Sequence, residues 1–115
     1  MKNSSEVFQI LRHALCLLHK GWCQKQHATD AEGNECSPFV EEATNWDLMG
    51  AIQRAAYDEN RVDLTVRAYD VVRRFSNPRT LTVVNDDEDA TFARVTCLLG
   101  RAMNATAVQD KPDPE

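Results

Sequence analysis

The sequence predicts a mainly α-helical protein, a compact bundle of about four helices with a possible small β-hairpin over residues 22–37. Two observations support this fold class: apolar residues recur at helical spacing in four segments, and one polar, glycine-containing stretch follows the first segment. With 115 residues, 43% of them hydrophobic, the chain is long enough to bury a core of its own. We expect a single helical domain over residues 1–104 and a flexible C-terminal tail over residues 105–115.

The first helix is predicted over residues 5–20. Apolar residues recur there three or four positions apart and therefore share one face: Val7, Ile10, Leu11, Ala14, Leu15 and Leu18. Gly21 directly follows Lys20 and is expected to end this helix. The next stretch is polar, and its Asp30 and Gly33 suit a tight turn. A β-hairpin and a plain ordered loop both remain open for it.

Two further helices are predicted in the middle of the chain. The second spans residues 46–57 with Asn45 as its N-terminal cap, and the third spans residues 61–75 and is ended by Pro78. After the proline, residues 80–84 form a β-branched run, which favours a short strand or an extended link.

The last helix is predicted over residues 87–104. Its apolar face is defined by Phe92, Val95, Leu98, Leu99, Ala102 and Met103. The acidic run from Asp86 to Asp89 precedes this face, and carboxylates at a helix start complement the positive end of the helix dipole.

The charge balance restricts the partners that we expect. The chain has 13 Lys and Arg against 18 Asp and Glu, a formal net charge of -5. This balance disfavours direct binding to nucleic acid or to an anionic membrane surface, because both need a basic face. It permits a basic protein partner, although a moderate negative charge also serves solubility alone. No secretory signal is visible, so we expect a cytoplasmic protein, and its oligomeric state stays open.

Residue types that bind metals or act as nucleophiles occur without a supporting pattern. His13, Cys16 and His19 lie three residues apart, and each step turns about 300° around a helix, so their side chains diverge. There is no CxxC pair, no glycine-rich phosphate loop and no recognisable catalytic motif. Cys23 and Cys36 would lie opposite each other only in a hairpin, and in a reducing compartment we expect free thiols. We therefore predict no metal site, no cofactor and no catalytic residue.

The two tryptophans, Trp22 and Trp46, each open a new segment. As large aromatic residues they suit anchors of a binding interface. The favoured interpretation is that they plug the end of the bundle and donate each indole N–H to a loop carbonyl, because large aromatic residues dominate small cores.

A family pattern runs through most of the chain. It comprises Gly21-Trp22-Cys23-Gln24, then Asp30 and Gly33, then Trp46 with Gly50-Ala51 and Arg54-Ala55, and later Asn85-Asp86 and Thr91. In these motifs the chain resembles an uncharacterised family of small bacterial and phage proteins, a domain of unknown function. Two positions depart from it, since Asp47 stands where the family tends to carry Cys and Val84 where it tends to carry Trp. The resemblance implies no established activity, and its phage members favour a regulatory binder by association.

The residues in these motifs also have structural interpretations. Asn85 and Asp86 are placed either to cap the last helix or to accept hydrogen bonds from the loop that contains Gln24.

The leading functional hypothesis is a small non-enzymatic protein-binding or regulatory module, of phage or mobile-element origin. Its candidate binding residues are Trp22, Gln24, Asp30, Trp46, Asn85 and Asp86. One alternative is an acidic inhibitor of a nucleic-acid-binding or defence complex, in which the Asp86–Asp89 run imitates phosphates. The other alternative is an enzyme with an unrecognised polar site around Cys23, Gln24 and His27, which requires these side chains to meet Asn85 and Asp86 at one cavity.

Overall fold

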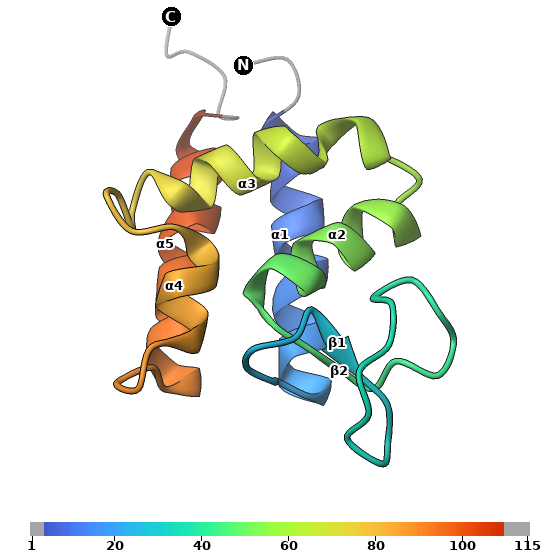
Figure 1. Ribbon diagram of the computed structural model, residues 1–115. Helices are drawn as coiled ribbons and strands as arrows, with labels where there is room; N and C mark the ends of the chain where they lie inside the picture. Colours follow the sequence, from blue (N-terminus) through green and yellow to red (C-terminus); the bar gives the residue numbers. More distant parts are fainter. Residues whose placement is uncertain (1–3, 110–115) are drawn as a thin grey trace, which may run out of the picture.

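The computed structural model describes residues 4–109, and within them the chain is mainly helical with one small antiparallel sheet (Figure 1). This confirms the predicted fold class. The α-helices are α1 (Ser4–Lys20), α2 (Leu48–Asp58), α3 (Thr65–Arg73), α4 (Leu81–Asp86) and α5 (Phe92–Gln109). A short 3-10 helix, η1 (Val62–Leu64), precedes α3 directly, so the predicted third helix is divided into two parts.

Helix α1 is the centre of the bundle and packs most extensively against α2 and α5. Its apolar face is buried, with Val7, Ile10, Leu11, Ala14, Leu17 and Leu18 at most 5% exposed. The helix ends at Lys20, where the Gly21 amide donates to the Leu17 carbonyl. The predicted first helix is therefore confirmed. Cys16, in contrast, is exposed on the opposite face and takes no part in the core.

Residues 21–47 form an irregular segment at one end of the bundle (Figure 1). The predicted turn is present, because the Asp30 carboxylate accepts from the amides of Glu32 and Asn34, and Gly33 has a φ of 83°. Across this turn, the described residues form one isolated β-bridge, between Thr29 and Glu35. Strand β1 (Ala28–Thr29) pairs instead with β2 (Asn45–Trp46), which lies after the whole loop.

The prediction of a strand or extended link over residues 80–84 was wrong. The Thr80 hydroxyl accepts from the Val83 amide and caps α4, which begins at Leu81. Leu81 and Asn85 are both fully buried and lie four residues apart, so a helix brings them to the same face. Burial of this face outweighs the strand preference of β-branched residues, which depends strongly on context.

The predicted start of the last helix was also wrong. Asp86 ends α4 and Asp87 caps its C-terminus, so the rest of the acidic run, residues 87–89, lies in the loop between two helices. Helix α5 begins at Phe92, where the Thr91 hydroxyl accepts from the Arg94 amide. At its other end α5 continues past Asn104 to Gln109, so residues 105–109 of the predicted tail are helical. The remainder of that tail, residues 110–115, lies outside the described residues.

The start of α2 differs from the prediction by two residues. Asn45 and Trp46 belong to β2, and the cap is Asp47, whose carboxylate accepts from the Gly50 amide. Asn45 uses its side-chain amide elsewhere and donates to the Thr29 hydroxyl at 3.1 Å, which ties the two strands together.

In the part of the chain that the structure describes, none of the helices has both the length and the apolar surface that crossing a membrane requires.

Gly50 lies where α2 meets the loop that precedes β1. A β-carbon at this position would overlap the carbonyl oxygen of His27, and it would also crowd the Asp47 carboxylate. The backbone of His27 therefore contacts the helix surface directly, and only glycine permits this approach. Gly100 in the middle of α5 is different, because a β-carbon there meets no atom within 4 Å.

Substitution of these two glycines separates close packing from helix propensity. We expect Gly50→Ala to lower the free energy of unfolding by at least about 2 kcal/mol, since the backbones must move apart. The matched substitution Gly100→Ala should raise it by about 0.5–1 kcal/mol, since alanine favours a helix over glycine. Urea denaturation followed by circular dichroism measures both, and equal effects of the two substitutions would contradict this account.

Candidate functional site

Asn85 lies fully buried near the end of α4, and its side-chain amide joins α4 to two other segments of the chain. Its Oδ1 accepts from the Trp22 indole N–H at 2.8 Å and from the Leu48 amide at 2.9 Å. Its Nδ2 donates to the Cys23 carbonyl at 3.1 Å and to the Asp86 carboxylate at 2.9 Å. Both lone pairs and both N–H groups of the amide are used, so this side chain has a structural role.

Residues 23–25 are held against the end of α4 by further bonds. The side-chain amide of Gln24 donates to the Asn85 carbonyl at 2.9 Å, and the Lys25 backbone amide donates to Asp86 Oδ1 at 2.7 Å. Lys25 adopts a left-handed backbone conformation with a φ of 71°. Of the two roles considered for Asn85 and Asp86, the structure therefore shows the second, in which they accept bonds from the Gln24 loop.

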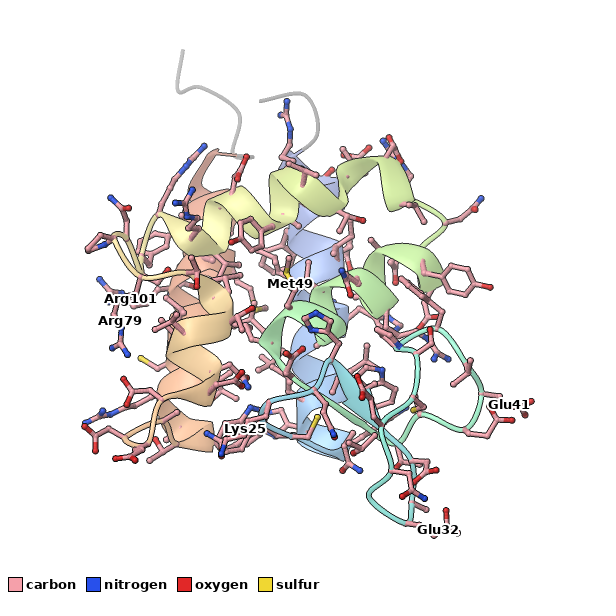
Figure 2. All side chains as sticks on the ribbon, viewed as in Figure 1. Lys25, Glu32, Glu41, Met49, Arg79 and Arg101 are labelled. Carbon is pink, nitrogen blue, oxygen red and sulfur yellow. The ribbon has the colours of Figure 1, made fainter. Side chains whose placement is uncertain are left out.

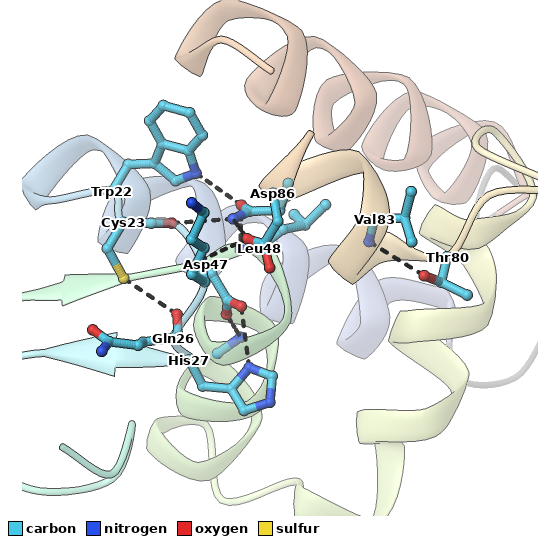
Figure 3. Close-up of polar contacts among 12 residues, drawn as sticks. Trp22, Cys23, Gln26, His27, Asp47, Leu48, Thr80, Val83 and Asp86 are labelled. Carbon is cyan, nitrogen blue, oxygen red and sulfur yellow. Dashed lines mark hydrogen bonds and ion pairs between the residues drawn. The ribbon is translucent and has the colours of Figure 1, made fainter. Parts of the chain in front are cut away.

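His27 and Asp47 form a polar pair beside this junction (Figure 3). The Nδ1 atom of His27 lies 3.1 Å from Oδ2 of Asp47, and the Asp47 side chain is only 2% exposed while half of the imidazole faces solvent. Burial raises the pKa of the Asp47 carboxyl above its usual value, against the opposing effects of the Gly50 amide and of His27. A hydrogen bond to an ionised Asp47 requires His27 to donate from Nδ1, because a carboxylate only accepts.

An open cavity of about 230 Å³ lies next to this pair. It is lined by Lys25, Gln26, His27, Glu35, Asp47, Thr82 and Asp86. These residues come from the Gln24 loop, the turn before β2, the start of α2, and α4. Of the six binding residues predicted from the sequence, Asp86 alone contributes to its wall.

The other predicted binding residues have packing or positioning roles. Trp22 and Gln24 attach the loop to α4, and the carboxylate of Asp30 closes the turn that contains Gly33. Trp46 is 4% exposed, and its indole N–H donates to the Pro38 carbonyl at 3.2 Å. Trp46 thus donates to a loop carbonyl, as the second interpretation of the tryptophans expects. Trp22 donates instead to the side chain of Asn85.

Cys23 is a poor candidate for a nucleophile. Burial, reinforced by the nearby charge of Asp47, raises the pKa of its thiol to about 11. The thiol lies 3.4 Å from the Gln26 carbonyl, to which it donates. Cys23 is therefore protonated at neutral pH, and a thiolate is the form that attacks substrates. Cys23 and Cys36 are both free thiols in the structure.

A second candidate surface is formed by residues 30–44, which we call the acidic lobe. It carries five carboxylates, Asp30, Glu32, Glu35, Glu41 and Glu42, and neither Lys nor Arg. Glu32 and Glu41 extend outward from it, on the side of the molecule opposite to Arg79 and Arg101 (Figure 2). The lobe therefore concentrates negative charge at one end of the protein.

An exposed aromatic pair lies at the base of the acidic lobe. Phe39 and Tyr57 of α2 are 43% and 53% exposed, and their rings pack edge to face with centroids 5.3 Å apart. Arg54 fixes the chain on either side of Phe39 by donating to the carbonyls of Pro38 at 2.9 Å and Val40 at 3.0 Å.

Sequence reasoning did not select His27 with Asp47, or Phe39 with Tyr57, as binding residues. A sequence signal exists for the lobe, namely five acids without a basic residue over residues 30–44. No local signal marks the two pairs, because their partners lie 20 and 18 positions apart in the sequence and meet only through the packing of the loop on α2.

The described residues contain no group of three or more His, Cys, Asp or Glu side chains that is placed to hold a metal ion. The two histidines of α1 that were considered as metal ligands have other contacts. His13 pairs with Asp58 and Glu59, and the ring of His19 packs against Phe92.

The fold and its surfaces define a small, mainly helical protein that carries one displayed polar segment. The chain belongs to the family of unknown function DUF6197, which it matches over residues 2–105. This confirms that its resemblance is to a domain of unknown function. The two departures occupy defined positions, with Asp47 capping α2 and Val84 packed against the core. No curated protein and no solved structure matches the chain.

Removal of the Asn85 amide tests its role in joining the three segments. We expect Asn85→Ala to lower the free energy of unfolding by at least about 3 kcal/mol, because the Trp22 indole, the Leu48 amide and the Cys23 carbonyl lose a buried partner. Asn104→Ala, at an exposed position on α5, is the control and should change it by less than about 0.5 kcal/mol. Urea titrations that give the same midpoint for both variants would refute the structural role.

Thiol labelling tests the protonation state of Cys23. With its pKa raised to about 11, the thiolate fraction and hence the alkylation rate should increase roughly tenfold for each pH unit between about pH 7 and pH 10. Peptide mass spectrometry after timed iodoacetamide treatment measures this rate, with exposed Cys97 of the same molecule as reference. Fast labelling of Cys23 at neutral pH that no longer rises with pH would show that the thiol is activated after all.

Proposed function

We propose that the protein is a non-enzymatic protein-binding module that binds a basic partner through the acidic lobe. The observation that carries this proposal is the exposed pair of Phe39 and Tyr57 beside residues 30–44, a segment with five carboxylates and neither Lys nor Arg. Aromatic residues at the centre of a polar rim are typical of the residues that dominate binding energy in protein interfaces.

Contacts of Arg54 hold the backbone beside the aromatic pair in place, which favours binding at a low entropic cost. Arg54 bonds to two carbonyls of the lobe, and its guanidinium lies 5.9 Å from the centroid of the Trp46 ring. It also forms an ion pair with Asp58, one turn further along α2. A surface that is already ordered loses little side-chain freedom when a partner docks.

The charge of the acidic lobe indicates the kind of partner. Five carboxylates within 15 residues repel an acidic surface and attract a basic one, and this effect mainly accelerates association and selects the partner. The ion pairs of Arg54 and Arg61 do not neutralise the carboxylates of the acidic lobe. Arg54 pairs with Asp58 and Arg61 pairs with Asp63, and both acids lie outside the lobe.

The acidic run of residues 86–89 supports a phosphate-imitating surface less well than the lobe does. Asp86 accepts from Lys25 and Asn85, and Asp87 pairs with Arg79. Arg94 also donates to the Asp89 carbonyl, so two arginines lie beside the run. The charge of Asp87 is thereby compensated within the protein, and the nearby arginines make the run a poor imitation of phosphates.

Binding is favoured over catalysis by the state of the polar residues near the cavity. Asn85 has no hydrogen-bonding capacity left for a substrate, and the raised pKa of Cys23 keeps its thiol protonated. An enzyme at this place would have to rely on the other titratable residues of the cavity wall, such as His27 and Asp47, for proton transfer.

Affinity capture with matched variants tests the proposed surface. The immobilised protein should retain a basic partner from lysate, and Phe39→Ala should weaken its retention at least about tenfold through the loss of an aromatic anchor. Val66→Ala, a change at an exposed apolar residue of α3, should leave it unaltered. Raising the salt from about 0.1 M to about 1 M should release the partner, because the screening length falls from about 10 Å to about 3 Å. Equal retention by both variants, or retention that does not change with salt, would reject the acidic lobe as the partner-binding surface.

A further inference from the structure

Two acids in the wall of the cavity beside His27, Glu35 and Asp86, have carboxylate oxygens that no other described residue bonds. His27 contributes its half-exposed imidazole, whose Nδ1 lies 3.1 Å from Oδ2 of Asp47. Asp86 uses Oδ1 for its two bonds, so Oδ2 remains available as an acceptor. The carboxylate of Glu35 is exposed and makes no hydrogen bond or ion pair with any other described residue.

The charged residues of the cavity wall also favour a cationic ligand group. Three acidic residues, Glu35, Asp47 and Asp86, line the cavity against one lysine, Lys25, and of these acids Asp47 is buried with a side chain only 2% exposed. A ligand group that only donates and carries a positive charge matches this wall, and the ammonium of Lys and the guanidinium of Arg are such groups. A carboxylate or phosphate would meet the same acceptors with like charge.

The cavity is held open by bonds between separate segments. The Lys25 amide is fixed to Asp86, and the His27 carbonyl accepts from the Asp47 amide at 3.2 Å. With about 230 Å³ the cavity is smaller than the roughly 300–1,000 Å³ of sites for drug-sized molecules. A single long side chain is a suitable occupant.

We propose that this cavity is a subsite that receives one Lys or Arg side chain of the partner. The proposal rests on the proposed function, and it extends the acidic lobe, because Glu35 belongs both to the lobe and to the cavity wall. Asp47 acts there as a positioning residue, since it holds the imidazole of His27 at the wall of the cavity.

Small analogues of the two side chains test the subsite without the partner. The probes are n-butylammonium and n-propylguanidinium, with butanoate and n-butanol of similar size as references. In two-dimensional amide and imidazole NMR spectra, the cations should shift the signals of residues 25–27, 47 and 86 in a saturable manner. The two references should leave these signals in place.

Two variants with the same change of charge locate the binding. Glu35→Gln should weaken the binding of n-propylguanidinium about tenfold, because a charge-assisted hydrogen bond is lost. Glu41→Gln, at another exposed acid of the lobe that does not line the cavity, should change it less than about twofold. Both side chains are exposed, so both variants are expected to fold.

Three outcomes would overturn the subsite: butanoate binding as tightly as the cations, saturable shifts confined to other parts of the molecule, or equal effects of the two variants. Failure here is distinct from failure of the proposed function. Partner capture without cation binding rejects the subsite alone. Cation binding in the cavity without any captured partner rejects the protein-binding function and leaves a site for a small cationic ligand.

Discussion

The four hydrogen bonds of the Asn85 side chain are the interaction on which the polar end of this protein depends. They connect α4 to Trp22 and Cys23 in one loop and to the first residue of α2. The loop has few ladder bonds of its own, because its strands are two residues long. A buried amide with all its groups satisfied thus supplies the order that regular secondary structure does not supply here.

Asp47 connects the loop that Asn85 holds in place to the cavity beside His27. One of its oxygens caps α2 and the other bonds to His27, so the same carboxylate ends the loop, starts the helix and orients an imidazole. Burial of this carboxylate is unfavourable in itself, which is why its pKa is raised. The close approach of the His27 backbone to Gly50 then sets the distance between the loop and the helix.

The two proposed binding features belong to one surface. The acidic lobe offers an aromatic anchor and long-range charge, and the cavity beside His27 adds acceptors that suit a single cationic side chain. The arginines at positions 79 and 101 lie on the far side of the molecule (Figure 2). This separation of charge would orient the proposed basic partner toward the lobe.

The sequence by itself determined the elements whose apolar residues repeat at helical spacing. The period of α1 and the positions of Leu48, Ile52, Val72 and Leu99 were sufficient to predict a helical core, and all of these residues are buried. Tertiary structure alone decided the conformation of residues 80–84, the partner of β1 and the meeting of His27 with Asp47. The physical reason is that spacing encodes which face of a segment avoids water. The choice among weak local preferences comes from buried hydrogen bonds, such as those of Asn85, between residues far apart in the chain.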